Sequence, residues 1–294
     1  MAEKQKIIDR RDFLKTAGRA IASTALVSGP LASTLCAANV ENEDEFDKYD
    51  FIMARVKFDH DEKEVDKWDV RPGGDANLLE ELSSVIRCKV KPIRDTNNWH
   101  PQYASEGQLN AVVTFDQPKK LKNYPFLFMT GENHFEFGAK QKRNLKEYIK
   151  RGGFLLMDDC VVGNGGDFFY KSAHKMLEEV FGAGAVQKIP REHEIFHNVY
   201  DLGDTGLPEL QFKKTRRPSG PRPRKQGQRS ALPYMHGQNH GARGVFIGER
   251  LAVFLSSTDI HCGWCDRDGS EFSRASYEKA IQMGINIIMY AISH

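Results

Sequence analysis

A strand, a helix and a second strand with short connections limit the fold of this chain more than any other feature. Residues 124–130 form a short, almost wholly apolar run that ends at Gly131, which is typical of a strand buried on both faces. A helix over 139–151 follows and stops at Gly152-Gly153. Another apolar run begins at Phe154. The spacing predicts two parallel strands joined by a right-handed helical crossover.

The remaining patterns continue this alternation. Further strands are predicted over 51–58, 89–93, 186–189, 244–248 and 251–256, and further helices over 77–86, 168–181 and 274–292. The economical assembly is an α/β fold, an open and mainly parallel sheet with helices on both faces. A hydrophobic content of 40% and a charged content of 28% exclude disordered, collagen-like and coiled-coil chains. Outside the N-terminal leader no apolar stretch is long enough to predict a transmembrane helix.

The N-terminus resembles a twin-arginine signal peptide. Arg10 and Arg11 precede Phe13-Leu14-Lys15, and a mildly apolar stretch rich in Ala, Ser and Thr follows. Cleavage after Ala38 would remove residues 1–38 and leave a polar lead-in over 39–49 before one domain over 50–294. The chain is therefore expected to be exported folded by the twin-arginine machinery, to the periplasm or outside the cell. Twin-arginine export often carries proteins with a bound cofactor, but no motif here identifies one.

The number of cysteines suits an oxidising compartment, but the sequence does not determine which of them form disulfides. Four of them follow the signal, namely Cys88, Cys160, Cys262 and Cys265. The last two, in Cys-Gly-Trp-Cys, could form a disulfide, supply two thiolates to a metal, or act as a redox pair. A single C-x-x-C without further spaced ligands is weak support for zinc.

A basic insertion interrupts an otherwise acidic domain. Residues 213–229 contain eight basic residues and no acidic one, within a Pro- and Gly-rich segment over 213–244. Its basic residues could dock an acidic partner, or the segment could be a solvated linker. Nucleic acid is disfavoured as a partner because no aromatic stacking positions are interleaved with the charges. A small molecule or another protein is the expected partner, of unknown identity.

Candidate functional residues follow the predicted central strand. Asp158, Asp159 and Cys160 stand where an open α/β sheet binds ligands, at the carboxyl end of a strand, before the glycine-rich residues 163–166. Cys160 is a candidate nucleophile, with His134 or His193 as the catalytic partner that would lower its pKa. Two adjacent carboxylates would act against this activation by raising the pKa of the thiol.

Neighbouring strand ends extend this candidate site. Glu132 follows one strand, and Asp259 and His261 follow another, so the ligand-binding rim is expected to comprise Glu132, Asp158, Asp159, Asp259 and His261. Such a set suits a metal site or a hydrolase as well as a polar cleft with neither activity.

A second motif runs from His193 to His197 and fits H-E-x-x-H, the zinc-protease pattern. The pattern requires a helix to bring both imidazoles onto one face. Pro190 and the extended character of the flanking residues argue against that helix, so a zinc protease is disfavoured.

Five spaced motifs resemble a known family. They are Phe51 to Phe58 with its central Arg55, Tyr124 to Gly131, Gly152 to Asp159, the Ile189-Pro190 pair followed by His193 and Ile195-Phe196, and Asp259 followed by Gly263-Trp264. Together they resemble the bacterial domain of unknown function (DUF) family 4159 over residues 50–292.

The resemblance implies a fold similar to class I glutamine amidotransferases, a three-layer, flavodoxin-like, doubly wound sheet. That superfamily places its nucleophile in a Gly-x-Cys-x-Gly elbow, which is absent here because Asp158 and Asp159 precede Cys160. The leading hypothesis is therefore a ligand- or partner-binding domain without glutaminase activity. The alternative is a hydrolase that uses Cys160 or a metal held by Asp158, Asp159 and His261.

Overall fold

The computed structural model describes residues 46, 48–59, 68–93, 109–160, 167–203, 239–265, 267 and 272–294. The predicted signal peptide, the glycine-rich residues 163–166 and the basic residues 213–229 lie outside the described residues.

The described residues form a seven-stranded sheet with the order β2-β1-β3-β4-β7-β6-β5. Its strands are β1 (Ala54–Val56), β2 (Val112–Val113), β3 (Phe126–Gly131), β4 (Phe154–Asp159), β5 (Val186–Lys188), β6 (Arg243–Ile247) and β7 (Arg250–Ser256). All pairs from β2 to β7 in this order are parallel, whereas β6 is antiparallel to both of its neighbours. The predicted mainly parallel sheet is confirmed.

The central strands β3 and β4 run side by side in the same direction. Their register pairs Phe126 with Phe154 at one end and Gly131 with Asp159 at the other. The two phenylalanine rings stack at 6.0 Å between centroids and 11° between planes. The segments that follow the two strands therefore emerge at the same edge of the sheet, as the sequence predicts.

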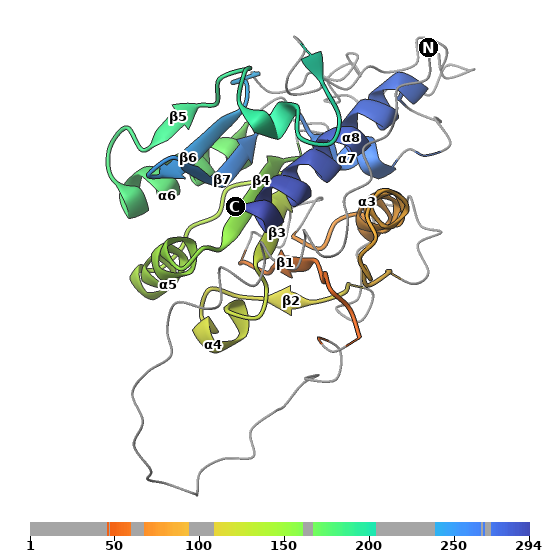
Figure 1. Cartoon of the computed structure of the whole chain (residues 1–294). Helices are drawn as coiled ribbons and strands as arrows, with labels where there is room; N and C mark the ends of the chain where they lie inside the picture. The colour runs from red at the N-terminus through yellow and green to blue at the C-terminus, as the bar shows by residue number, and fades with distance from the viewer. Residues whose placement is uncertain are drawn as a thin grey trace, which may run out of the picture.

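Helices cover both faces, which gives three layers (Figure 1). The helices are α3 (Pro72–Val85), α7 (Ile260–Cys265) and α8 (Arg274–Ser293) on one face, and α5 (Ala139–Lys150) and α6 (Phe168–Phe181) on the other. A short helix, α4 (Pro118–Leu121), packs against α5. The architecture is compatible with a flavodoxin-like fold.

Side-chain alternation along β4 creates the two cores. Phe154 and Leu156 pack in the core with α3, α7 and α8. Leu155 and Met157 pack in the core with α5 and α6. A strand with both faces buried must be apolar throughout, and this explains the near-continuous apolar runs of β3 and β4.

The connection between α5 and β4 depends on its two glycines. Gly152 has a φ of 101°, a conformation that L side chains rarely adopt. Gly153 lies against the ring of Tyr148, so a Cβ atom there would collide with the aromatic carbons. The Tyr148 hydroxyl lies within hydrogen-bond distance of backbone carbonyls at the starts of β3 and β4, which share its single proton.

Several predicted boundaries differ from the structure. Helix α3 begins at Pro72, five residues before the predicted start, because proline is well suited to the first turn of a helix. The predicted strand over 89–93 is reduced to a single bridge between Phe51 and Val90. The sequence did not predict β2, α4 or α7, which are too short to show a periodic pattern.

None of the helices in the described ranges has the length and apolar character needed to cross a membrane.

Candidate functional site

Asp158 and Asp159 end β4 and point to opposite faces of the sheet, as successive strand residues must. On one face Asp158 accepts hydrogen bonds from the amides of Ile260 (3.2 Å) and His261 (2.8 Å), at the start of α7. On the other face Asp159 accepts a hydrogen bond from the amide of Tyr170 (2.9 Å), in the first turn of α6. Each carboxylate therefore binds the otherwise unpaired amides of a helix N-terminus.

Burial makes both carboxyl groups weaker acids than an exposed aspartate. It raises the pKa of Asp158 to about 6, against the lowering effect of hydrogen bonds from Ser256 and the two α7 amides. Burial and the nearby charges of other aspartates raise the pKa of Asp159 well above its ordinary value. Asp159 Oδ1 has no hydrogen-bond partner among the described residues. The two carboxyl groups hold the N-termini of α7 and α6, on opposite faces of the sheet, and both are buried.

Cys160 follows these carboxylates and is fully buried. Its sulfur lies 3.4 Å from the sulfur of Cys262, in α7. Arg71 Nη1 donates to the Cys262 sulfur at 2.7 Å, yet burial raises the pKa of Cys262 to about 12. A nucleophile requires a reachable thiolate, and Cys160 lies inside the core of the α3, α7 and α8 face.

Asp259 completes this buried cluster. A carboxylate oxygen of Asp259 and the sulfurs of Cys160 and Cys262 lie within 4.8 Å of one another. Asp259 has a φ of 55° and accepts a hydrogen bond from the Cys262 amide at 3.3 Å. Burial first, and then the charge of Asp158, raise the pKa of Asp259 to about 7.

His261 belongs to a different buried group, centred on Arg55. Arg55 donates to both carboxylate oxygens of Asp75, at 2.8 and 2.6 Å, and to the carbonyl of Trp68 at 2.9 Å. His261 Nε2 lies 2.8 Å from the same guanidinium and 3.2 Å from Asp75. Burial and the charge of Arg55 lower the pKa of His261 to about 4, so the imidazole is neutral at pH 7. Its Nδ1 has no hydrogen-bond partner among the described residues.

The sequence analysis did not assign a role to this Arg55–Asp75 pair or to Arg71. One signal was present, since Arg55 interrupts a strand whose other inward positions are apolar. A buried guanidinium requires a carboxylate partner. The sequence could not show that Asp75, in the first turn of α3, would be that partner.

His134 and His193 lie away from Cys160. His134 is exposed after β3, and its Nδ1 contacts Ser172 of α6 at 3.2 Å, on the α5 and α6 face. The ring of His193 packs on Phe246 and Tyr290, whose hydroxyl accepts from the Leu251 amide at the start of β7. That position is the amino end of the sheet, opposite Cys160. Glu132 is buried at the carboxyl end of β3.

The H-E-x-x-H residues form a short 3-10 helix, Glu194–Phe196, instead of an α-helix. His193 caps it, with Nδ1 accepting from the Ile195 amide at 3.2 Å. His197 instead pairs with Asp201 at 2.7 Å and with the Arg191 carbonyl at 2.8 Å. The two imidazoles therefore serve separate local contacts, in agreement with the rejection of a zinc protease.

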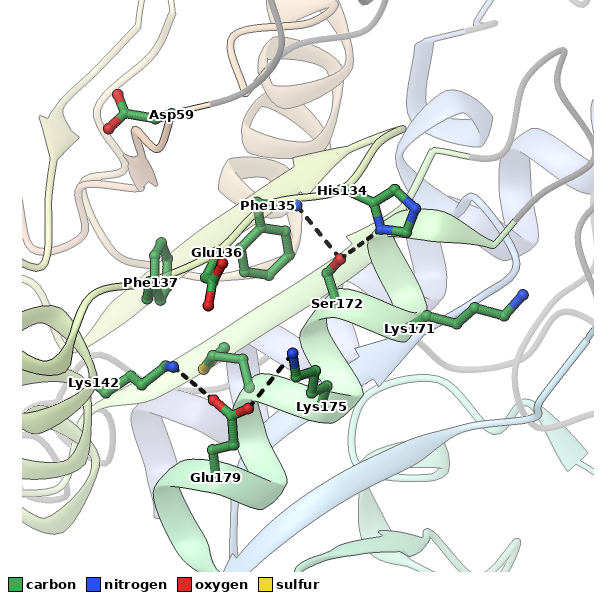
Figure 2. A pocket seen from close by; sticks show the side chains of 11 residues that line it. Asp59, His134, Phe135, Glu136, Phe137, Lys142, Lys171, Ser172, Lys175 and Glu179 are labelled. Atoms are coloured by element: carbon green, nitrogen blue, oxygen red, sulfur yellow. Dashed lines mark hydrogen bonds and ion pairs between the residues drawn. The ribbon is translucent and has the colours of Figure 1, made fainter.

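A pocket of about 610 Å³ opens beside the carboxyl ends of β1 and β3 (Figure 2). Asp59, which follows β1, lines it together with residues 134–137, which follow β3. The opposite wall is one stripe of α6 that includes Ser172, Lys175 and Glu179. Of the candidate residues from the sequence, only His134 lines this pocket.

The pocket combines an apolar floor with charges of both signs. Phe135, Phe137 and Met176 are buried beneath it. At the rim, Figure 2 shows Lys142 and Lys175 converging on the carboxylate of Glu179, at 2.6 and 3.8 Å. Such a mixture of apolar surface and a few oriented polar groups is typical of small-molecule sites.

Replacement of Arg55 by Met is expected to destabilise the fold strongly. The change leaves the carboxylate of Asp75 buried without its cation, which costs about 3–5 kcal/mol. The double substitution Arg55→Met with Asp75→Leu should recover most of this loss, because it removes both charges of the pair. Urea denaturation at pH 7 measures both, with Lys188→Met on the exposed edge of β5 as the control. A double variant no more stable than Arg55→Met would contradict the assignment.

Asp259→Asn should change how stability depends on pH. The folded protein holds a proton on Asp259 up to a pKa of about 7, whereas the unfolded chain releases it near 3.8. Wild-type stability should therefore decrease between pH 4 and 7 through this group. Asparagine cannot ionise, and it keeps both the acceptor and the left-handed backbone. Relative to wild type, the variant should gain on the order of 2 kcal/mol between pH 5 and pH 8 in urea denaturation. A difference that is constant with pH would refute this.

Comparison with known proteins supports one assignment. No curated protein matches the chain significantly. The model of the family described as Domain of unknown function (DUF4159) matches residues 52–292, which include every described strand and nearly all of the last helix. The chain belongs to the DUF4159 family.

Proposed function

We propose that this chain is an exported binding domain with a class I glutamine amidotransferase-like fold and no glutaminase activity. Its ligand is a small molecule that carries charged groups of both signs and an apolar part. The observation that carries the proposal is the position of the 610 Å³ pocket in the sheet.

The pocket lies at the switch point of the sheet. After β1 the chain leads to β2, on one side of the β1–β3 pair, and after β3 it leads to β4, on the other side. The loops after β1 and β3 therefore separate, and open α/β sheets bind ligands in the crevice between such loops. Asp59 and residues 134–137 belong to these two loops. The same rule led the sequence analysis to the end of β4, one strand further along.

The lining chemistry defines the ligand class. Three lysines (Lys142, Lys171 and Lys175) and three acids (Asp59, Glu136 and Glu179) line the pocket around the aromatic floor. Lys142 and Lys175 pair with Glu179, whereas the ammonium of Lys171 pairs with Asp167 at 3.0 Å. Formal charges balance, so the lining favours neither a polyanion nor a polycation. A zwitterion with an apolar side group, such as a free amino acid, matches both signs and the floor.

The buried thiol argues against glutaminase or hydrolase activity. Cys160 has no exposed surface, and Asp158 uses both oxygens on α7 amides. His134 lies on the α5 and α6 face and His193 at the amino end of the sheet, so neither is placed to activate the thiol. A covalent acyl intermediate on Cys160 would require the core to open.

One nuclear magnetic resonance experiment tests binding and inactivity together. The protein is mixed with the free amino acids, including glutamine, and saturation transfer is recorded. We expect saturation transfer to apolar amino acids. The Ser172→Trp variant, in which the indole fills the pocket, should weaken their binding at least ~10-fold. Lys188→Trp on β5 is the matched control and should bind normally. Glutamine should remain unchanged over hours.

Three results would overturn the proposal. They are the absence of transfer to any amino acid, transfer that Ser172→Trp leaves intact, and the appearance of glutamate and ammonium. The last result, if removed by Cys160→Ser, would establish the glutaminase that the proposal denies.

The export part of the proposal rests on residues 9–15 and is tested separately. Arg10→Lys with Arg11→Lys should keep the chain in the cytoplasm as an uncleaved precursor, because the twin-arginine pair is the element that the machinery recognises. Immunoblots of cytoplasmic and periplasmic fractions measure this, with Lys4→Arg as a control. Cleaved periplasmic protein from the double-lysine variant would refute export by this route.

A further inference from the structure

We propose that Cys160 and Cys262 form a disulfide bond that joins the end of β4 to α7. Their sulfurs are in contact, 3.4 Å apart, and both side chains are fully buried. None of the four described cysteines is joined to another in the structure. A disulfide needs the sulfurs about 2.05 Å apart, so the two sulfurs must move closer together by about 1.4 Å.

The neighbouring thiol of Cys265 is directed elsewhere. Its sulfur lies 3.4 Å from the carbonyl oxygen of His261 and 3.9 Å from that of Arg71. The Cys262 sulfur faces Cys160 and the Arg71 guanidinium instead. The geometry therefore does not favour a disulfide between Cys262 and Cys265 of the C-x-x-C motif. It favours Cys160, 102 positions earlier in the chain, as the partner of Cys262.

A metal is the competing occupant of this cluster. Two sulfurs and a carboxylate oxygen within 4.8 Å of one another resemble a partial zinc site. Arg71 argues against it, because its Nη1 lies 2.7 Å from the Cys262 sulfur and brings a permanent positive charge to the place where a dication would bind. A disulfide is uncharged, so the positive charge of Arg71 does not repel it.

The oxidant is a small-molecule disulfide, and the reaction is thiol–disulfide exchange. The Cys262 thiolate attacks one sulfur of the oxidant, forms a mixed disulfide and releases one thiol. The Cys160 thiolate then attacks the Cys262 sulfur, which closes the bond and releases the second thiol. Two protons leave the protein thiols, and the oxidant gains the two electrons. Because both sulfurs are fully buried, the exchange requires local opening of α7 to expose them to the oxidant. Arg71 stabilises the Cys262 thiolate, but burial opposes it, so closure should be slow at neutral pH.

The test uses the full chain in buffer with oxidised and reduced glutathione. Remaining thiols are alkylated after denaturation, and the unreduced digest is analysed by mass spectrometry. We expect a peptide pair that links Cys160 to Cys262, with Cys36, Cys88 and Cys265 alkylated. Because the bond closes a loop of about a hundred residues, it should raise the melting temperature by roughly 10 °C, and dithiothreitol should reverse the shift.

Variants and metal analysis separate the alternatives. Cys265→Ser should retain the bond and its temperature shift, whereas Cys160→Ala and Cys262→Ser should both lose them. A link between Cys262 and Cys265 would overturn the proposal, as would full alkylation of all thiols. Stoichiometric zinc in the purified protein, lost in Cys160→Ala, would assign the cluster to a metal instead. Failure of one cysteine variant to fold leaves the peptide link in the wild-type chain as the deciding measurement.

Discussion

The buried ion pair between Arg55 and Asp75 constrains the arrangement of three elements at once. A guanidinium removed from water is tolerated only when its charge is balanced and its donors are used. Asp75 of α3, the Trp68 carbonyl and His261 of α7 provide the partners of Arg55 on β1. Burial alone would raise the pKa of Asp75, but the charge of Arg55 and the hydrogen bonds that it donates to the carboxylate keep that pKa low. The positions of α3 and α7 over the sheet thus follow from one charge on β1.

The carboxyl ends of the central strands show how similar residues take different roles. Asp158 and Asp159 sit at the position where many α/β proteins bind ligands, yet their oxygens bind the amides of α7 and α6. Burial removes both groups from solvent and raises the pKa of each, which limits their use as surface ligands. The open space lies one strand away, beside β3, where His134 and the aromatic residues after it meet α6.

The long elements could be predicted from the sequence because each carries its own periodic signal. The parallel pairing of β3 with β4, the hairpin of β6 and β7, and helices α5, α6 and α8 follow from apolar runs, glycines and helical spacing. Helix α7 could not be predicted, since its six residues contain no repeat and Asp158 supplies the acceptors for its first amides. Its stability depends on contacts distant in sequence.

The candidate site was only partly predictable for the same reason. Position along a strand indicated correctly that residues 158–160 reach the carboxyl end of the sheet. Position along a strand could not show that Asp158 and Asp159, which point to opposite faces, each bind the amides at the N-terminus of a helix. Nor could spacing reveal that Cys262 contacts Cys160, or that His193 lies at the far end of the sheet, because both depend on how the helices close over it.

The antiparallel pairing of β5 with β6 brings together two parts of the chain that are distant in sequence. Lys188 on β5 pairs directly with Arg243 on β6, so the sheet holds the two ends of the intervening chain side by side. Between them, the chain first returns to the core through Ile195 and Phe196 and hydrogen-bonds to Asn286 of α8. Only beyond Gly203 does added length act as loop closure, at a cost of about 0.6 kcal/mol per doubling of loop length. A change of length or charge confined to residues 204–238 would therefore leave these core contacts in place, which makes that stretch a suitable position for grafting a reporter or affinity module.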